Sequence, residues 1–367
     1  MNPFIRREIH PVGQGALYSE SFYMNSESRP DFVALYDCGS FNKTRLFMEI
    51  EGLPQKIDCL FVSHFHFDHI NGIERLIEMK QVHQIYVPLL TPSQFIISLL
   101  YNTFEHIADK PSVEFMMRCL NSFRFNDSKL KDNVRIVLVS KRFQTNVEIG
   151  GQCLWHYDVD VECSEAEALP RFLNNLASML DMDKDELIAA IEEFQTEKWY
   201  KSLLDKMCSE NVVKDVRRLY RQCFSSDGNA VSLIAYSYRD KPSTECDKFD
   251  CVYTGDAKLS DNMVQVISKW APQYIQVPHH GSNYNHIPQL YCPRQVAFIS
   301  VGEKNKYHHP SLEVINYFAD NCVKIHCVTE NIATRLKVSA NLVRVETRSH
   351  FRSDFTVMRK KHLKCFG

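Results

Sequence analysis

The sequence predicts an α/β protein in which two sheets pack against each other. Short runs rich in β-branched and aromatic residues alternate with helical patterns in both halves of the 367-residue chain, and a helical segment separates the halves. Hydrophobic residues make up 44% of the chain and charged residues 24%, a balance typical of a globular protein with a sizeable core. We therefore expect one large domain over residues 1–367.

The expected strands fall into two sets, one on each side of the helical segment. The first set comprises Phe32 to Tyr36, Cys59 to Val62, Gln84 to Val87 and Arg135 to Val139. The second set comprises Val231 to Tyr236, Cys251 to Tyr253, Tyr274 to Val277, Val296 to Val301 and Lys324 to Val328. Two strand-rich halves indicate two packed sheets.

Helical periodicity dominates residues 164–224. One apolar helical face is formed by Leu169, Phe172, Leu173, Leu176, Met179 and Leu180, and a second by Val212, Val216, Leu219, Tyr220 and Cys223. We interpret this segment as a helical insertion, because strands resume directly after it; a small separate interaction domain is the alternative. Another helix is expected to begin at Thr91-Pro92, where a cap residue precedes proline.

The composition restricts what the protein binds and where it acts. A net charge of −2 gives no overall attraction to nucleic acid or membranes. The N-terminus lacks the apolar core of a signal peptide, and no apolar stretch is long enough to span a bilayer. The thirteen cysteines include no C-x-x-C pair and lie mostly in apolar runs, which indicates free thiols in a reducing compartment. We expect a cytoplasmic protein that binds no membrane.

Seven of the fifteen histidines fall in three short windows, each directly after an expected strand. The windows are His64-Phe65-His66-Phe67-Asp68-His69, Pro278-His279-His280-Gly281-Ser282 and Asn305-Lys306-Tyr307-His308-His309-Pro310. Strand alternation is expected to point His64 and His66 to one side, and the turn that follows carries Asp68 and His69. Imidazole with some carboxylate is the donor set that zinc and similar divalent ions favour.

A carboxylate suited to bridge two ions follows the strand Cys251 to Tyr253. In Thr254-Gly255-Asp256, the glycine allows close backbone approach and the strand delivers Asp256 to its end. Taken alone, Asp256 would be an ordinary turn residue; beside the first histidine window we expect it to bridge two ions. A helical pattern begins near Ser311, and a helix N-terminus beside an imidazole suits an anionic substrate oxygen.

These motifs resemble those of the metallo-β-lactamase superfamily, whose first metal motif, H-x-H-x-D-H, is matched by residues 64–69. The full motif set is similar to that of the hydrolase domain of the competence protein ComEC. It comprises Val12-Gly13-Gln14-Gly15, Tyr36-Asp37-Cys38-Gly39, Asn229-Ala230-Val231-Ser232-Leu233, Thr254-Gly255-Asp256 and the three histidine windows. The resemblance covers roughly Val12 to Val328. It implies an αββα sandwich of two mixed sheets flanked by helices, with residues 164–224 inserted and without ComEC's membrane-channel segments.

The resemblance also implies a centre of two divalent ions, zinc or alternatively manganese. The expected metal ligands are His64, His66, Asp68, His69, Asp256 and His279. Asp37 is expected to accept a hydrogen bond that orients a ligand. Asp68, His280 and His309 form the expected catalytic set, in which His309 or the unliganded histidine of the 279–280 pair donates to a phosphoryl oxygen or protonates the leaving group. Where many superfamily members have a further histidine ligand, this chain has Ser232; His156 is interpreted as structural.

Two such metal ions activate water as a hydroxide nucleophile. Centres of this kind hydrolyse many substrates, including lactams, lactones and phosphodiesters. The ComEC-like motifs and the missing histidine favour a phosphodiesterase, most specifically a nuclease. A basic stripe from Arg335 to Gly367 holds nine Lys or Arg residues against Glu346 and Asp354, and ends in Arg359-Lys360-Lys361-His362-Leu363-Lys364. Such a stripe can follow nucleic-acid phosphates, or it can be a solvated edge strand and tail.

Two other functions remain open from the sequence. The first is a small-molecule hydrolase that acts on a nucleotide, cyclic nucleotide, lactone or lactam. The second is a regulatory or binding subunit that a protein partner gates through the helical insertion.

Overall fold

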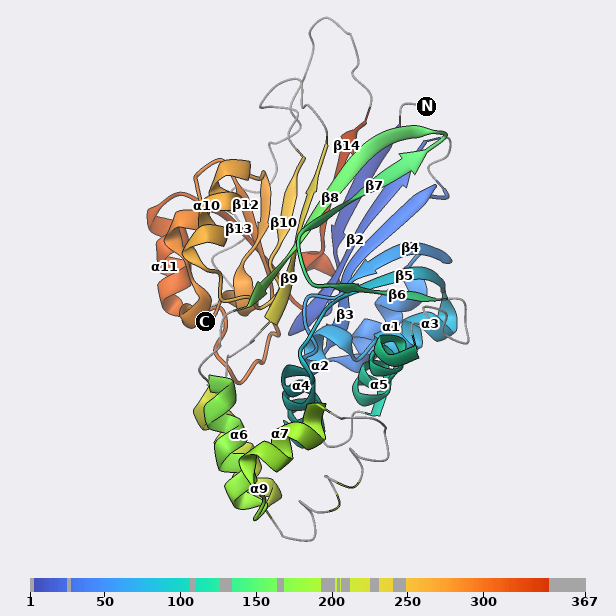
Figure 1. Ribbon diagram of the computed structural model, residues 1–367. Coiled ribbons are helices and arrows are strands. Elements are labelled where there is room, and N and C mark those ends of the chain that lie inside the picture. The colour runs from blue at the N-terminus through green and yellow to red at the C-terminus, as the bar shows by residue number, and fades with distance from the viewer. Residues whose placement is uncertain are drawn as a thin grey trace, which may run out of the picture.

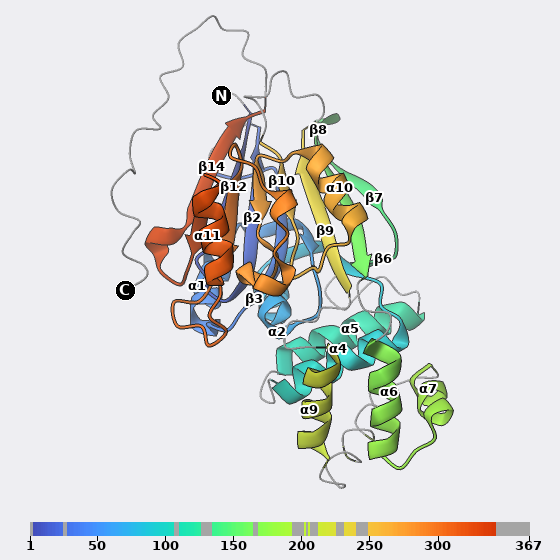
Figure 2. The same ribbon diagram turned by 90° about the vertical axis from the view of Figure 1, so that its left-hand side faces the viewer.

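The computed structural model describes residues 3–24, 28–105, 110–125, 134–163, 168–192, 202, 205, 212–224, 231–239 and 249–342. Within these ranges, two seven-stranded sheets pack face to face and helices cover their outer faces (Figures 1 and 2). The predicted α/β sandwich of two mixed sheets flanked by helices is thus confirmed.

The first sheet has the strand order β14-β1-β2-β3-β4-β5-β6. Its strands are β1 (Phe4–Ile9), β2 (Gly15–Tyr23), β3 (Phe32–Ser40), β4 (Lys56–Phe61), β5 (Gln81–Pro88), β6 (Arg135–Val139) and β14 (Leu336–Asn341). Pairings from β14 to β3 are antiparallel, and pairings from β3 to β6 are parallel.

The second sheet repeats this division into an antiparallel and a parallel half. Its order is β13-β12-β11-β10-β9-β8-β7, parallel from β13 to β10 and antiparallel from β10 to β7. Its strands are β7 (Phe143–Ile149), β8 (Gln152–Cys163), β9 (Val231–Tyr238), β10 (Cys251–Tyr253), β11 (Tyr274–Gln276), β12 (Val296–Ser300) and β13 (Lys324–Val328).

The helices form three groups. On the side of the first sheet lie α1 (Lys43–Gly52), α2 (Phe67–Ile70), α3 (Ile73–Met79), α4 (Pro92–Glu105) and α5 (Lys110–Phe125); on the second sheet lie α10 (Asp261–Trp270) and α11 (Leu312–Asp320). Within residues 164–224, the predicted helical insertion, the described helices are α6 (Ala168–Met179), α7 (Lys184–Glu192) and α9 (Val213–Phe224), which lie between β8 and β9 in the chain. The helices α7 and α9 contact α4 at one end of the sandwich, and α6 packs against both of them (Figure 2).

Local sequence explains where several helices begin. Thr91 and Gln94 form a capping box, in which the Gln94 N–H donates to Thr91 Oγ1 over 3.3 Å and the Thr91 N–H donates to Gln94 Oε1 over 2.9 Å. The helix predicted at Thr91-Pro92 therefore begins there. Ser311 caps α11, because its Oγ accepts a hydrogen bond from the Val314 N–H over 3.3 Å.

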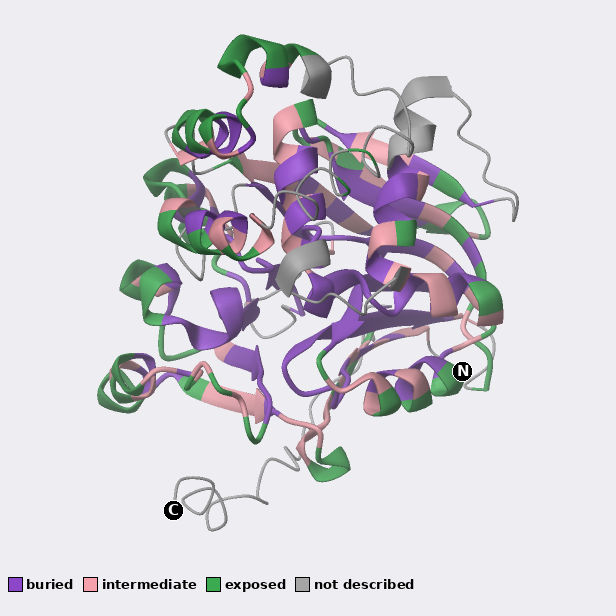
Figure 3. Cartoon of the chain, turned by 90° about the horizontal axis from the view of Figure 1, so that it is seen from below, coloured by how far each residue is buried: buried purple, intermediate pink, exposed green. Residues whose placement is uncertain are grey.

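The interface between the sheets is a core rich in large aromatic side chains. Tyr18, Phe22, Trp155 and Phe298 are each at most 1% exposed and belong to one cluster contributed by both sheets. Seen from below, buried residues fill the interior of the sandwich and exposed residues lie at its margins (Figure 3).

A buried ionic network also joins the two sheets. Arg7 of β1 is 0% exposed and contacts Glu20 of β2, with Nη2 2.6 Å from Oε1. Glu20 in turn accepts hydrogen bonds from Tyr157 over 2.5 Å, Ser237 over 2.6 Å and Tyr253 over 2.9 Å, all from the second sheet. The carboxylate of Glu20 therefore connects strands of both sheets.

All nine predicted strands are present, and the structure adds β1, β2, β7, β8 and β14. The missed strands include β7 and β14, which alternate between half-buried and exposed residues and carry few apolar runs. None of the cysteines in the described ranges forms a disulfide. Among the same residues, no helix has the length and apolar character needed to cross a membrane.

Candidate metal centre

The histidine windows and Asp256 meet at the carboxyl ends of the parallel strands. Asp37 lies near the end of β3, residues 63–69 follow β4, Asp256 follows β10, and residues 279–280 follow β11. Sheets with parallel strands form their binding sites at this edge, because the loops after neighbouring strands converge there. Topology thus brings together residues that are far apart in the sequence.

Asp256 lies among four imidazoles. Its Oδ2 is 3.8 Å from Nε2 of His64 and 3.8 Å from Nε2 of His279. Its Oδ1 is 3.2 Å from Nε2 of His69 and 3.7 Å from Nε2 of His280. A carboxylate with one oxygen toward each pair of imidazoles has the position that a bridging ligand requires.

Two sets of three side chains in the described residues have donor atoms within 4.8 Å of one another. The first donor group is His64, His69 and Asp256, and the second donor group is Asp68, His69 and His280. The two groups adjoin because they share His69 and because Asp256 Oδ1 also approaches His280. All members are at most 7% exposed.

Several donor atoms at this point are buried and make no hydrogen bond. They are Nε2 of His64, His69 and His280, and Oδ1 of Asp256. Buried polar atoms are nearly always satisfied, and each one left alone costs about 1–3 kcal/mol. Divalent cations held between these atoms would satisfy them, so the residues fit a metal centre. The nitrogen and carboxylate donors suit zinc or manganese.

Asp37 and Ser63 contact the Nδ1 atoms of His69 and His64, on the opposite side of each ring from Nε2. Asp37 Oδ2 is 2.8 Å from Nδ1 of His69, and the carboxylate also accepts the N–H and the hydroxyl of Ser63, each over 2.7 Å. Ser63 Oγ is 2.9 Å from Nδ1 of His64. A carboxylate behind a metal-binding histidine fixes its tautomer and turns Nε2 toward the metal. The contacts therefore support the role expected of Asp37.

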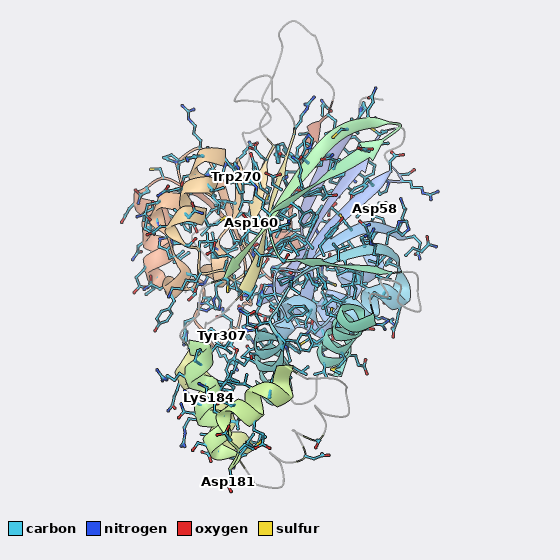
Figure 4. The ribbon with its side chains drawn as sticks, viewed as in Figure 1. Asp58, Asp160, Asp181, Lys184, Trp270 and Tyr307 are labelled. Carbon is cyan, nitrogen blue, oxygen red and sulfur yellow. The ribbon has the colours of Figure 1, made fainter. Side chains whose placement is uncertain are left out.

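Replacing Asp37 by asparagine is expected to weaken metal binding by about 10- to 100-fold, because His69 loses its anionic partner. Titration against a competing chelator measures this change. The matched control is Asp58→Asn: the Asp58 carboxylate accepts the Val33 N–H over 2.9 Å, and Figure 4 shows it on the outer part of the first sheet. Equal metal affinity in both variants would contradict the role of Asp37.

Three site residues adopt left-handed backbone conformations. Asp37, His279 and His280 have φ of 56°, 51° and 52°. Such conformations cost on the order of 1 kcal/mol or more for residues with a side chain, and they concentrate at functional sites. In this conformation, Nδ1 of His280 donates to the Ser300 carbonyl over 2.8 Å, and its Nε2 lies 3.3 Å from Asp68 Oδ2.

Two glycines permit the close packing of the site. A Cβ on Gly39 would lie 2.5 Å from the backbone of Asp68 and His69, and a Cβ on Gly255 would lie 2.5 Å from Cβ of Ser63. Both positions lie in the motifs Tyr36-Asp37-Cys38-Gly39 and Thr254-Gly255-Asp256. The glycines therefore let the strand ends approach the first histidine window.

His66 lies beside both donor groups but belongs to neither. Its ring centroid is 4.6 Å from that of His64, and it stacks on Tyr101 of α4 with centroids 4.1 Å apart. The two histidines do lie on one side as predicted, although β4 ends at Phe61 and the backbone at His66 is extended loop. The expected turn after His66 is the one-turn helix α2.

His309 lies on the far side of His279, with ring centroids 5.8 Å apart. Asn305 fixes its backbone, since Asn305 Oδ1 accepts the His309 N–H over 2.8 Å and Asn305 Nδ2 donates to the His309 carbonyl over 2.8 Å. Both ring nitrogens of His309 are buried without a hydrogen-bond partner. This imidazole is therefore available to a bound substrate.

Burial and neighbouring charges together set the protonation of the imidazoles and carboxylates at the site. Burial lowers the pKa of His66 to about 3 and that of His309 to about 4, so both rings are neutral at pH 7. Burial opposes ionisation of Asp68, but the imidazole of His280, 3.3 Å away, and that of His69 lower its pKa to about 2. Burial also opposes the charge on His69, yet the carboxylates of Asp256 and Asp37 hold its pKa well above the usual value.

Sequence reasoning missed several contributors to the site. Ser63 and Tyr101 carry no metal-binding signature, and their contacts depend on the packing of separate elements. Asn305 lies in the third histidine window, but its local contacts with His309 were not predicted. The Leu233 N–H, next to Ser232, donates to the Ser63 carbonyl over 2.7 Å, so the start of β9 lies beside the first histidine window. Asn229, the first residue of that motif, lies outside the described residues. The division of His279 and His280 into ligand and acid stays a prediction; the second donor group contains His280.

A family model described as the metallo-β-lactamase superfamily matches residues 17–96, which include Asp37 and the whole first histidine window. Comparison with curated proteins gives no match. Among solved structures, the chain is similar to a long form RNase Z from yeast, with a TM-score of 0.35 and 8% sequence identity. That similarity covers 89% of this chain and 36% of the other, so this chain spans about a third of that protein's length.

The family match over residues 17–96 and the two mixed sheets flanked by helices are consistent with a metallo-β-lactamase fold. Together with the two donor groups, they support a metal-dependent hydrolase.

Proposed function

We propose that the protein is a phosphodiesterase that uses two divalent metal ions, and that its substrate is a nucleic acid. The observation that carries this proposal is the position of Asp256 between two adjoining donor groups, with an oxygen toward each. When bound, two such ions supply positive charge to an attacked phosphoryl group and lower the pKa of a water toward neutrality. The ComEC-like motifs and Ser232 in place of a histidine favour phosphodiesters over lactams.

The chain's own residues have separable roles in this proposal. His64, Asp68, His69, Asp256 and His280 hold the ions, and His66, whose ring lies 4.6 Å from that of His64, serves as a further ligand from outside the two donor groups. Asp37 and Ser63 keep His69 and His64 oriented. His309 is neutral at pH 7, so its N–H can donate to a phosphoryl oxygen. This assignment gives His280 the ligand role that the sequence gave to His279, and leaves His279 between Asp256 and His309.

Only some residues of the basic stripe are proposed to contact nucleic acid. Arg335 pairs with Glu49 over 2.6 Å and with Glu8 over 3.2 Å, and Lys337 pairs with Glu8 over 3.0 Å. These partners neutralise the two basic residues of the stripe that the structure describes. Contact with nucleic-acid phosphates therefore falls to the seven remaining basic residues, which lie in 343–367, outside the described residues.

Phosphodiester hydrolysis by the metal-loaded protein tests the proposal. We expect cleavage of bis(p-nitrophenyl) phosphate and of single-stranded DNA after addition of zinc or manganese, and loss of both activities on chelation. Hydrolysis of a lactone or lactam without any phosphodiester cleavage would overturn it in favour of a small-molecule hydrolase.

A second function is favoured by one specific contact, that between the metal motif and the helical insertion. Tyr101 of α4 stacks on His66, and Tyr220 of α9 lies against Tyr101 with ring centroids 5.3 Å apart. Phe172 of α6 packs edge-on to Tyr220 at 6.1 Å. This aromatic series runs from the insertion to the metal motif. A partner that binds the insertion would thus reach His66 through two side chains, as a partner-gated enzyme requires.

Tyr101→Ala is expected to weaken metal binding by about tenfold, because the ring that holds His66 in place is removed. Tyr101→Phe keeps the ring and should bind metal as the wild type does. Metal titration of both variants makes the comparison. If Tyr101→Ala binds metal as tightly as Tyr101→Phe, the insertion does not position His66.

A further inference from the structure

A groove of about 480 Å³ lies beside the metal centre. It is lined by the loop after β11 and by the segment that leads from β12 into α11, and His309 belongs to its wall. Because the ring of His309 is 5.8 Å from that of His279, whose Nε2 is 3.8 Å from Asp256, the groove adjoins the donor groups. Its volume lies within the range of small-molecule sites.

Two polar side chains in the wall of the groove are buried without hydrogen-bond partners. Ser282 is 1% exposed and its Oγ makes no hydrogen bond, and both ring nitrogens of His309 are in the same state. The backbone holds Ser282 in place, because its N–H donates to the His279 carbonyl over 2.9 Å. Ser311, which caps α11, lies in the same wall. Hydroxyl, imidazole and helix N-terminus together suit an anionic oxygen.

The remaining wall includes two tyrosines, one exposed and one half-buried. Tyr284 is 77% exposed, and Tyr307 lies parallel to His309 with an interplanar angle of 15°. Figure 4 shows Tyr307 at the end of the sandwich nearest the helical insertion. Planar aromatic side chains beside a phosphate site are the arrangement on which nucleobases stack. Glu313, also in the wall, can accept a hydrogen bond from a base amino group.

We infer that this groove is a subsite for the nucleobase next to the scissile phosphodiester. Ser282 and His309 contact a phosphate oxygen, and Tyr284 and Tyr307 stack on the base. The inference rests on the proposed phosphodiesterase function and assigns the part of the site that holds a nucleobase of the substrate.

The test compares three substrates of the metal-loaded full-length protein. They are a short single-stranded DNA, an abasic strand of the same length with the same phosphates, and 3′,5′-cyclic adenosine monophosphate. Tyr284→Ala is expected to raise KM for the base-bearing strand by about tenfold, the size of one lost stacking contact, and to leave the abasic strand unaffected. Tyr284→Phe should retain stacking. Ile332→Ala, at a residue 61% exposed and outside the groove, is the matched control.

The outcomes distinguish a failure of the proposed subsite from a failure of the proposed phosphodiesterase activity. A preference for the base-bearing strand that depends on Tyr284 supports the subsite and indicates a polymeric substrate. A preference for the cyclic mononucleotide that depends on Tyr284 also supports the subsite and indicates a small substrate. Equal cleavage of both strands, unchanged by Tyr284→Ala, overturns the subsite and leaves the phosphodiesterase standing. Absence of cleavage on all three substrates overturns the phosphodiesterase, and the subsite with it.

Discussion

Asp256→Ala is expected to abolish metal-dependent hydrolysis, with a fall in kcat/KM on the order of 1,000-fold or more. The carboxylate contacts imidazoles of both donor groups, so its removal opens both sites at once. Without bound metal, water loses the lowered pKa, about 7 in catalytic zinc sites, that makes it nucleophilic at neutral pH. The rate on bis(p-nitrophenyl) phosphate, measured with added zinc or manganese, checks the expectation.

Two further variants give this prediction its control. Asp256→Asn keeps the size of the side chain but removes its charge, and should lose activity nearly as fully. Asp261→Ala removes an exposed carboxylate from the first turn of α10 and should retain activity. Unchanged hydrolysis by Asp256→Ala would mean that this centre does not perform the reaction.

Glu20→Ala is expected to lower the free energy of unfolding by about 3–5 kcal/mol, a large fraction of the stability of an ordinary domain. The change leaves the Arg7 guanidinium buried and uncompensated, and it removes the acceptor of the hydroxyls of Tyr157, Ser237 and Tyr253. Urea unfolding followed by circular dichroism measures the loss. The metal centre lies elsewhere in the sandwich, so the variant tests the fold.

The control for this second prediction is a paired replacement. Arg7→Met with Glu20→Leu removes both charges and fills the space, so it should be less destabilised than Glu20→Ala alone. Glu148→Ala, at an exposed residue of β7, should change stability by less than about 0.5 kcal/mol. A Glu20→Ala protein as stable as Glu148→Ala would show that the network does not join the sheets energetically.

The sequence was informative where chemistry and local pattern coincide. Apolar strands that end in histidine or aspartate gave both the parallel halves of the sheets and most of the donor residues. It was uninformative for Arg7 and Glu20, because charges in a strand usually face solvent. Their burial depends on hydroxyls of Tyr157, Ser237 and Tyr253, which are distant in the sequence.

The same limit explains the details missed at the site. The repeat of His64 and His66 predicts that they lie together, but the ring that stacks on His66 comes from Tyr101 in another helix. Adjacent histidines at 279 and 280 look equivalent in the sequence. Both have a left-handed backbone, and the Ser300 carbonyl distinguishes them, because it accepts a hydrogen bond from Nδ1 of His280 and so turns Nε2 of His280 toward Asp68.

The metal content of the purified full-length protein tests the central claim most directly. Inductively coupled plasma mass spectrometry, after incubation with zinc or manganese and removal of free metal, gives the number of ions per chain. The two adjoining donor groups predict about two ions per chain in the wild type and a loss of both in Asp256→Ala. A wild-type protein that holds no divalent metal, or an Asp256→Ala protein that keeps both ions, would contradict the account.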